Sequence, residues 1–332
     1  MKRYGYLFDS IISPDNLRLA FYKAQKGKSA KPDVMEFRRD LDRNLLRLHD
    51  SLADGSYRVG NYHYFRVYDP KERLICAAAF AERVIHHAIM NVCDPLFERH
   101  QVPFSYACRR DKGVFAALEQ ARRNQCRYSW FLKLDVRKYF DSIDHAVLLG
   151  LLRRLFKDER LLALLWHIID SYHVAPGKGN PIGNLTSQYF ANYYLSPADK
   201  YAVHTLQIPA YIRYMDDMLL WADSKEELQA KGLQLEKYID EKLSLALKPF
   251  VMNRTSHGLP ALGFLVYPHQ IRLNRRSRTR YAAKMRNYWC LLESGDITEK
   301  EFSINALALQ AFIAHANSRG FARRVNASFQ QD

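Results

Sequence analysis

Two adjacent aspartates inside an otherwise apolar stretch constrain the fold of this chain more than any other feature. The segment YIRYMDDMLLWAD places Asp216 and Asp217 between two apolar runs. The pattern over Pro209–Ala222 predicts a β-hairpin with both carboxylates at its tip. Two neighbouring carboxylates repel each other, and burying them between hydrophobic strands is unfavourable unless a cation is present. An exposed Asp-Asp turn, which is common in hairpins, is the alternative that this segment leaves open.

A further carboxylate, Asp135, lies near the end of the short apolar run WFLKLDV. This run predicts a buried strand over Trp130–Val136, and strand ends are where sheets of α/β and α+β proteins usually carry site residues. If this strand lies beside the hairpin, the three carboxylates converge. Oxygen ligands suit Mg²⁺, and two such ions can hold the attacking and leaving oxygens of a phosphoryl transfer. Spacing along the chain leaves the adjacency of the strands open.

The charge of the chain is unevenly distributed, which favours a polyanionic partner. The 332 residues include 50 Lys+Arg and 35 Asp+Glu, a net charge of +15. Residues 1–128 hold 23 basic and 15 acidic residues (+8), residues 129–270 hold 16 and 15 (+1), and residues 271–332 hold 11 and 5 (+6). A nearly neutral centre between two basic flanks suits a nucleic acid held from both sides. A merely solvated basic surface is the simpler alternative.

Several features argue against a membrane or secreted protein. No apolar run approaches the roughly 20 residues that a spanning helix needs, and the N-terminus MKRYGYLFDS lacks the apolar core of a secretory signal. The five cysteines are scattered without a C-x-x-C pair, which argues against a zinc site or a disulfide framework. We therefore expect a cytoplasmic protein with no membrane association.

The periodicity of apolar residues predicts alternating helices and strands, which indicates an α+β or α/β core. Helices are expected over 33–53, 78–97 (ending near Asp94-Pro95), 145–156, 161–172 and 187–194, and a capping box at 224–227 opens another. Strands are expected over 62–68, 130–136 and 262–267, with a Gly- and Pro-rich loop over 175–184. The last 60 or so residues are predicted to be helical and basic.

An ordered set of motifs carries a family resemblance. The set comprises DPKERLICAAAFAERVIHHAIMNVCDPLFER, FSYACRRDKG, FLKLDVRKYFDSIDH, GNPIGNLTSQYFANYYLSP, YMDD and LGFLVYP. In this order the motifs resemble a reverse transcriptase of the bacterial group II intron and retroelement type. The resemblance implies an α+β right-hand polymerase with fingers, a palm whose antiparallel sheet carries the catalytic aspartates, and a helical thumb. It divides the chain into an N-terminal region with fingers (1–128), a palm (129–270, with a fingers-side helical excursion at about 146–180) and a basic thumb (271–332).

The resemblance also implies roles for individual residues. Asp135, Asp216 and Asp217 become the catalytic carboxylates and the ligands of two Mg²⁺ ions. Phe140 matches the position of an aromatic ring under the sugar, where it excludes a 2′-hydroxyl and selects dNTPs; a core phenylalanine is the alternative. Arg73 and Lys71 match basic residues that grip the triphosphate, with solvated surface charge as the alternative. His86 and His87 are expected to belong to a helix face in the fingers rather than to bind a ligand.

The basic tail RLNRRSRTRYAAKMR has seven basic residues in fifteen, with Tyr281 among them. A thumb strand and helix that follow the template–primer backbone would explain this composition. The residues expected to contact template RNA and cDNA are Arg272, Arg275, Arg276, Arg278, Arg280 and Lys284.

The block Ile182–Gln188 indicates which subfamily of reverse transcriptases the chain resembles. Most intron-type and retron enzymes have Q-G-x-x-x-S-P here, whereas this chain has I-G-x-x-x-S-Q, which resembles reverse transcriptases of diversity-generating retroelements. Members of that family copy a template-repeat RNA with frequent errors at adenines, and the cDNA replaces a variable region of a target gene. Isoleucine cannot form the hydrogen bond that glutamine would make near the nascent pair, so geometric checking should loosen. Gly183 is expected to let the backbone approach the nucleotide closely.

The same resemblance implies a bacterial or phage origin and a small basic helical accessory protein that forms a ring. Two alternatives stay open. One is a retron-type or phage-defence reverse transcriptase that makes cDNA from a dedicated structured RNA. The other is an RNA-binding, maturase-like protein without polymerase activity.

Overall fold

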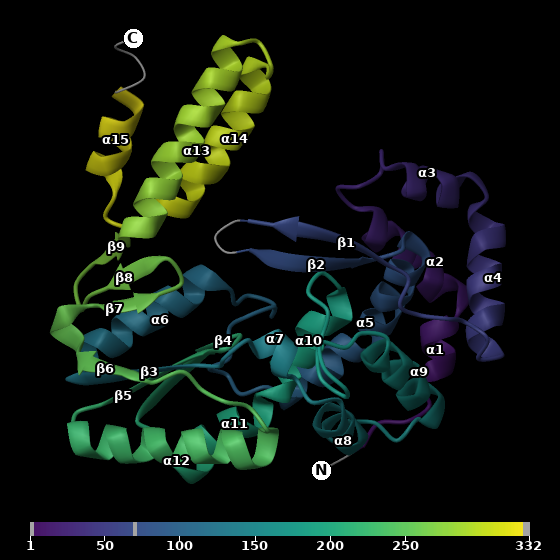
Figure 1. The fold of residues 1–332 in the computed structure, drawn as a ribbon, viewed down its shortest axis with the longest axis horizontal. Helices are drawn as coiled ribbons and strands as arrows, with labels where there is room; N and C mark the ends of the chain where they lie inside the picture. The colour runs from purple at the N-terminus through teal and green to yellow at the C-terminus, as the bar shows by residue number, and fades with distance from the viewer. Residues whose placement is uncertain (1–2, 69–71, 328–332) are drawn as a thin grey trace. The chain divides into compact units, whose positions relative to one another are not determined.

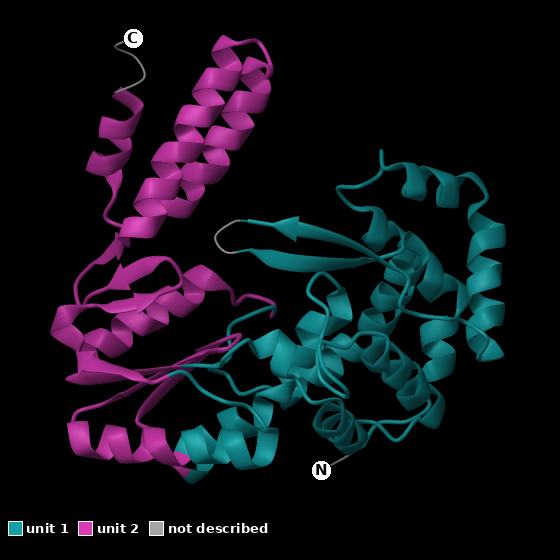
Figure 2. Cartoon of the chain, viewed as in Figure 1, with its two compact units in different colours: residues 1–108, 135–205, 235–248 teal, residues 109–134, 206–234, 249–332 magenta. Residues whose placement is uncertain are grey.

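The computed structural model describes residues 3–68 and 72–327 (Figure 1). The chain forms two compact units, each assembled from three separate stretches of sequence (Figure 2). Unit 1 comprises residues 1–108, 135–205 and 235–248, and unit 2 comprises residues 109–134, 206–234 and 249–332. Helices and antiparallel strand pairs together build the fold, so the predicted α+β class is confirmed.

Five helices form the first part of unit 1. They are α1 (Phe8–Ile12), α2 (Pro14–Gln25), α3 (Pro32–Arg39), α4 (Leu41–Ala53) and the long helix α5 (Phe80–His100). Helices α1, α2 and α3 contact both α4 and α5. The single helix predicted over 33–53 is wrong, because Asp40 has φ −128° and ψ 56° and separates α3 from α4. The apolar stripe continues across this break, so periodicity alone could not reveal it.

Helix α5 also differs from its prediction. It was expected to end near Asp94-Pro95 but continues to His100 with Pro95 inside it. Proline removes one backbone hydrogen bond from a helix. Leu96 and Phe97 lie just beyond and are buried, so burial of their side chains favours the additional turn.

A hairpin of β1 (Tyr62–Val67) and β2 (Arg73–Ala78) precedes α5. The strands are antiparallel, with Val67 opposite Arg73. The sequence predicts β1, whereas β2 was missed because its residues, RLICAA, run into an apolar helix without a turn signal between them.

The rest of unit 1 is mainly helical. Its elements are α7 (Tyr139–Ser142), α8 (His145–Leu155), α9 (Glu159–Asp170), α10 (Leu185–Tyr194), α11 (Ser196–Lys200), a π-helical turn (Tyr201–Thr205) and the end of α12 (Lys225–Leu243). The Asp144 and Asp158 side chains cap α8 and α9 by accepting backbone N–H bonds. The predicted helices and the loop over 175–184 are confirmed, with boundaries shifted by one to two residues.

A twisted sheet in the order β4–β5–β3–β6 is the centre of unit 2. Its strands are β3 (Trp130–Asp135), β4 (Ala210–Tyr214), β5 (Asp217–Ala222) and β6 (Val251–Arg254). Figure 1 shows α6 (Val114–Arg127) on one face of the sheet and α12 on the other. Gly232 of α12 permits this packing, since a Cβ atom there would lie 2.7 Å from Leu132 Cδ1.

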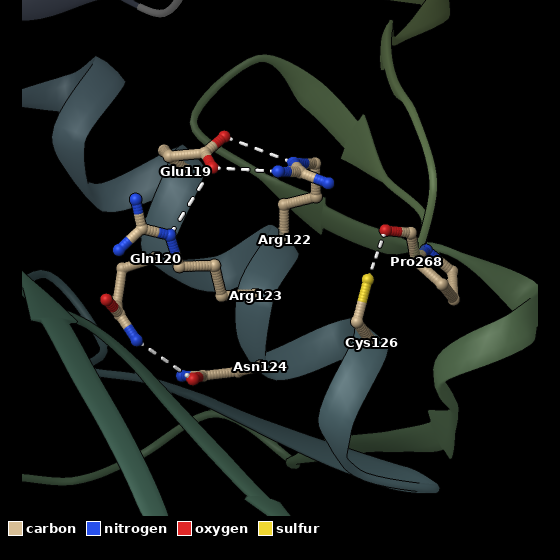
Figure 3. A network of polar contacts seen from close by, with 7 residues as sticks. All are labelled: Glu119, Gln120, Arg122, Arg123, Asn124, Cys126 and Pro268. Atoms are coloured by element: carbon tan, nitrogen blue, oxygen red, sulfur yellow. Dashed lines mark hydrogen bonds and ion pairs between the residues drawn. The ribbon is translucent and has the colours of Figure 1, made fainter.

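Helix α6 is tied to its surroundings by Gln125. The Gln125 amide accepts a 2.8 Å hydrogen bond from Trp221 of β5 and donates to the carbonyls of Thr255 and Val266. Figure 3 shows further contacts of α6, in which Glu119 binds Arg122 and Arg123 and the Cys126 thiol donates to the Pro268 carbonyl. The bonds of Gln125 and Cys126 hold α6 against the sheet and against the segment around Pro268, whereas the Glu119 pairs lie within the helix.

A small antiparallel sheet of β7 (Leu259–Ala261), β8 (Phe264–Val266) and β9 (Ile271–Leu273) leads into the C-terminal helices. The helices are α13 (Arg275–Glu293), α14 (Glu299–Ile313) and α15 (Arg319–Ala327). Thr298 and Glu301 form a capping box at α14. The predicted strand over 262–267 and the helical C-terminus are confirmed. Across the described part of the chain, no helix combines the length and the apolar character that crossing a bilayer requires.

Candidate active site

The predicted Asp-Asp hairpin is present in unit 2. Tyr214 of β4 pairs with Asp217 of β5, which leaves Met215 and Asp216 as the turn. Met215 has a left-handed φ of 53°, an unusual conformation for a residue with a long side chain that tends to mark functional sites. Asp216 therefore lies in the turn itself, whereas Asp217 is the first residue of strand β5.

A buried arginine, Arg213, braces this turn. Its side chain has no exposed surface, and its guanidinium donates a 3.0 Å hydrogen bond to the Met215 carbonyl. Burying a charged group is unfavourable unless it is well paired. The hydrogen bond to Met215 gives the guanidinium one such partner, and it fixes the backbone of the turn. The sequence analysis missed Arg213, although a cation in the middle of an apolar strand is a signal that could have identified it.

Each of two predicted carboxylates holds a lysine. Lys133 Nζ lies 2.7 Å from Asp217 Oδ1, with both side chains only 19% and 26% exposed. Lys133 is in β3, two residues before Asp135 and hence on the same face of the strand. This alternation is the signal by which the sequence could have revealed Lys133.

Asp135 is held by Lys248, whose ammonium lies 2.8 Å from both carboxylate oxygens. The Lys248 backbone N–H also donates to the Asp135 carbonyl at 2.9 Å. No local pattern singles out Lys248, because it lies 113 positions after Asp135 in the sequence. Both members of this pair lie within unit 1.

The order of strands answers the question that sequence spacing left open. β3, whose last residue is Asp135, is the neighbour of β5, whose first residue is Asp217. Asp135 and Asp217 each pair with an ammonium group, and carboxylate oxygens are hard donors of the kind that divalent cations such as Mg²⁺ prefer. The chemistry of these donors therefore fits a divalent metal ion.

The loop that carries Ile182 and Gly183 lies against the β1–β2 hairpin within unit 1. The Ile182 carbonyl accepts a 2.8 Å hydrogen bond from the Cys76 N–H. Gly183 has φ +127°, and a Cβ atom there would lie 2.9 Å from Ile75 Cγ2 and 3.0 Å from the Cys76 carbonyl oxygen. In this structure the close approach that requires glycine is to β2. Asn184, which the sequence analysis missed, accepts from the Ala78 N–H with its buried side chain.

The other predicted nucleotide-binding residues also belong to unit 1. Phe140 is half-buried in the short helix α7, and its carbonyl accepts a 2.8 Å hydrogen bond from the N–H of Asn180, which lies three residues before Gly183. Arg73 is exposed at the start of β2. Lys71 lies outside the described residues.

The predicted nucleic-acid-binding residues separate into different surfaces of unit 2. A cavity of about 850 Å³ is lined by Arg272, Arg275 and Arg278, together with Arg324 of α15. The guanidinium of Arg272 lies over the Tyr267 ring. Arg280 and Lys284 line a smaller cavity of about 250 Å³ instead, and Arg276 lines neither of these two.

The paired histidines of α5 have structural contacts, in line with the sequence analysis. His86 is 1% exposed, and its Nδ1 lies 3.0 Å from the Thr186 hydroxyl. Burial, aided by the nearby Arg83, lowers the pKa of His87 from about 6.5 to about 4. Both rings therefore belong to the packing of α5 against neighbouring segments.

Comparison with known proteins places these features in a known family. Residues 69–250 match the family described as reverse transcriptase (RNA-dependent DNA polymerase). The chain is 24% identical to protein YkfC of Escherichia coli over 282 residues, covering 70% of this chain and 72% of that protein. It is 25% identical to the group II intron-encoded protein LtrA of Lactococcus lactis over 211 residues, covering 59% of this chain but only 35% of LtrA.

Among solved structures, a telomerase from Candida albicans in complex with a telomeric RNA fragment aligns with a TM-score of 0.49 at 13% identity. That alignment covers 88% of this chain and 61% of the telomerase chain. The matched family segment spans more than half of the chain and includes the Asp135 strand, the Ile182 block and the Asp-Asp hairpin. A mixed architecture with antiparallel sheets is consistent with the right-hand polymerase fold expected from the motifs. The chain belongs to the reverse transcriptase family and is an RNA-directed DNA polymerase.

Proposed function

We propose that this reverse transcriptase copies a template-repeat RNA into cDNA with frequent errors at adenines, and that the cDNA diversifies a target gene. The observation that carries the proposal is the block Ile182–Gln188, where isoleucine and glutamine stand in place of the glutamine and proline of most related enzymes. The proposal places the protein in the cytoplasm of a bacterium, encoded by the cell or by a phage.

The chemistry is assigned to Asp135, Asp216 and Asp217, which would hold two Mg²⁺ ions. When bound, the ions supply the positive charge that stabilises the attacking and leaving oxygens of phosphoryl transfer. Lys133 pairs with Asp217 and Lys248 pairs with Asp135, so each of these partly buried carboxylates has a positive partner that favours its charged form. The braced turn at Arg213 and Met215 keeps Asp216 at a fixed place relative to β5.

The nucleotide is assigned to Arg73, Lys71, Phe140, Ile182 and Gly183. Arg73 and Lys71 would bind the triphosphate, and the Phe140 ring would lie under the sugar and exclude a 2′-hydroxyl. The hydrogen bond between Cys76 and Ile182 supports a shared pocket, since it joins the strand that begins with Arg73 to the loop of the 180s.

The Ile182 side chain would lower the fidelity of copying. Its backbone is held to β2, so the side chain cannot move away freely from its position beside the hairpin. An isoleucine there offers no donor or acceptor to a base or a sugar. A mispaired nucleotide therefore loses no hydrogen bond at this position, and discrimination against it falls. The missing hydrogen bond would raise the error rate at every template base, and the preference for adenine rests on the family resemblance.

Template RNA and cDNA are assigned to the basic C-terminal region. Arg272, Arg275 and Arg278 would contact the phosphate backbone, since they share one cavity with aromatic rings on which bases or sugars can stack. Arg276, Arg280 and Lys284 would contribute from neighbouring surfaces. The division into fingers (1–128), palm (129–270) and thumb (271–332) belongs to this proposal, as does a small basic helical accessory protein that forms a ring.

The deciding experiment is to purify the chain from cells that carry its native locus, together with any bound RNA and protein. Mg²⁺ and dNTPs are then added and the DNA product is sequenced, with Asp216→Asn as the blank. We expect cDNA of one RNA, with errors concentrated at template adenines. Accurate cDNA of a structured RNA would replace this proposal with a retron or defence function. Bound RNA without any DNA product, in the presence of all co-purified partners, would point to an RNA-binding protein instead.

A second measurement isolates the role of Ile182. In Ile182→Gln the misincorporation rate should fall by roughly tenfold, which corresponds to about 1.4 kcal/mol of added discrimination. Ile182→Val is the matched control, because it keeps an apolar β-branched side chain and should keep the error rate. An unchanged error spectrum in Ile182→Gln would remove this position from the account of fidelity.

A further inference from the structure

A group of metal-ligating side chains lies in unit 1, apart from the carboxylates assigned above. His145, Asp170 and His173 each offer one ligand atom, and these atoms all lie within 4.8 Å of one another. His173 Nε2 lies 3.5 Å from Asp170 Oδ1, and His145 Nδ1 lies 4.0 Å from the same oxygen. The residues come from the start of α8, the end of α9 and the loop that follows α9.

The buried histidine is oriented as a ligand. His145 is 1% exposed, and its Nε2 lies 2.7 Å from the Gly179 carbonyl oxygen. A carbonyl can only accept, so Nε2 carries the proton, and in the neutral ring Nδ1 presents a lone pair. Nδ1 is buried, has no hydrogen-bond partner and faces Asp170. Metal-binding histidines commonly donate their other ring N–H to a backbone carbonyl in this way.

The surroundings favour a cation. Asp170 is the last residue of α9, and the C-terminal end of a helix carries partial negative charge. The N-terminus of α8, which would repel a cation, is already capped by the Asp144 carboxylate. The Asp170 and His173 side chains are 48% and 42% exposed, so an ion could enter from solvent and keep a water ligand on its outer side.

We propose that His145, Asp170 and His173 form a binding site for Zn²⁺ or a similar borderline transition-metal ion. Two imidazoles and one carboxylate are the donor set that such ions prefer, whereas Mg²⁺ and Ca²⁺ favour oxygen ligands alone. Neighbouring ligands of a tetrahedral zinc ion lie about 3.3 Å apart, so closure requires movements of about 1 Å, which the exposed Asp170 and His173 side chains can supply.

The site would act as a clamp on the loop that follows α9. This loop is folded back onto α8: the His145 N–H donates to the Gly177 carbonyl, and the Gly179 N–H donates to the Ile143 carbonyl, both at 2.9 Å. The loop then continues to Asn180, which binds the Phe140 carbonyl, and on to Ile182. A bound ion would link α8, α9 and the loop through its bonds to His145, Asp170 and His173. It would thereby stiffen the segment that leads to the block Ile182–Gln188. The cysteine spacing could not reveal this site, because it contains no cysteine.

The test is a zinc titration of the full chain by calorimetry. The Asp216→Asn background and excess Mg²⁺ keep zinc from the catalytic carboxylates. We expect one equivalent of zinc to bind, and His173→Ala or Asp170→Asn to weaken the affinity at least tenfold. His204→Ala, which removes another exposed histidine of unit 1, is the matched control and should bind zinc like the parent. Equal zinc binding by the parent and His173→Ala would overturn the proposal and leave a plain His–Asp ion pair.

A second readout reports the location of the ion without using activity. The Trp166 ring lies edge-on to His145, with ring centroids 6.3 Å apart. Co²⁺, which quenches nearby tryptophans, should therefore lower the fluorescence of the parent, and the quenching should be lost in Trp166→Phe while Co²⁺ still binds. Quenching that survives in Trp166→Phe at full strength would place the ion elsewhere. The proposal does not depend on the polymerase being error-prone, so either can fail alone.

Discussion

The ammonium of Lys248 lies 2.8 Å from both carboxylate oxygens of Asp135. The same oxygens are the ones assigned to a metal ion, so lysine and metal compete for them. The two side chains are 45% and 28% exposed, and such partly solvated pairs are worth at most about 1 kcal/mol. The Lys248–Asp135 ion pair is therefore weak enough for a divalent ion to displace the lysine from the carboxylate.

Removing this competitor should strengthen metal binding. In Lys248→Met we expect the affinity for Mn²⁺, measured by electron paramagnetic resonance as a stand-in for Mg²⁺, to rise by up to about fivefold, which is the equivalent of about 1 kcal/mol. Lys242→Met, which changes a lysine at the end of α12, is the control and should leave the affinity unaltered. Weaker Mn²⁺ binding in Lys248→Met would mean that the lysine supports the ion instead of competing with it.

The parts of the site that local sequence patterns encode were predictable. The hairpin around Asp216 follows from apolar runs that flank acidic residues, and the strand of Asp135 follows from a short apolar run before a capped helix. Both signals lie within about a dozen residues, where strand and turn preferences act. The order of motifs then identified the family without any structure.

The partners of these residues were not predictable in the same way. Lys248 meets Asp135 across 113 positions of sequence, and no periodicity links them. Likewise, a Cβ atom at Gly183 would meet Ile75 and Cys76, which belong to a strand that local sequence patterns did not identify. Tertiary contacts between segments that are distant in sequence decide such pairings. Local patterns in a single sequence carry no signal for these contacts.

The contact at Gly183 makes a prediction about stability. Gly183→Ala must place a Cβ atom 2.9 Å from Ile75 Cγ2 and 3.0 Å from a backbone oxygen, at a φ of +127°. We expect the free energy of unfolding, measured by urea denaturation, to fall by about 1–3 kcal/mol more than in a control with strain alone. Gly55→Ala is that control, since Gly55 has φ +75° with nothing within 4 Å of its Cβ position. Equal losses of unfolding free energy in both variants would show that β2 can move away from the added methyl group at no energetic cost.

Sugar selection at Phe140 is testable by substitution. If the ring lies under the sugar, Phe140→Ala should open space for a 2′-hydroxyl and raise the ratio of rNTP to dNTP incorporation by about tenfold to a hundredfold, the range expected for losing a steric contact of about 1–3 kcal/mol. Single-nucleotide extension on a primed RNA template measures this ratio. Phe140→Tyr keeps the ring and should keep discrimination. If Phe140→Ala rejects rNTPs as strongly as the parent, Phe140 is a core residue of α7.

The cavity of the C-terminal region predicts how nucleic-acid binding depends on salt. Each arginine that contacts a phosphate contributes nearly one unit to the slope of log affinity against log salt concentration. Arg275→Gln and Arg278→Gln should therefore each weaken binding of a primed RNA template and lower that slope by about 0.7–0.9. Arg39→Gln, on the exposed end of α3, is a control that should change neither quantity. A slope that stays constant in both cavity variants would exclude phosphate contacts there.

Stability at acid pH should depend on His87. Burial and the neighbouring Arg83 lower its pKa from about 6.5 in the unfolded chain to about 4 in the folded one. Between these values the unfolded state binds more protons, so stability is complete above about pH 6.5, declines as the pH falls and levels off below about pH 4. In His87→Gln, which cannot gain a proton at this position, the free energy of unfolding should decline less than in the parent between pH 7 and pH 4. The difference should be on the order of 1 kcal/mol and is measured by urea denaturation. His204→Gln, at an exposed position, should keep the parent's pH dependence. Identical pH profiles for His87→Gln and the parent would mean that folding does not lower the pKa of His87, and that the surroundings of its ring tolerate the charge.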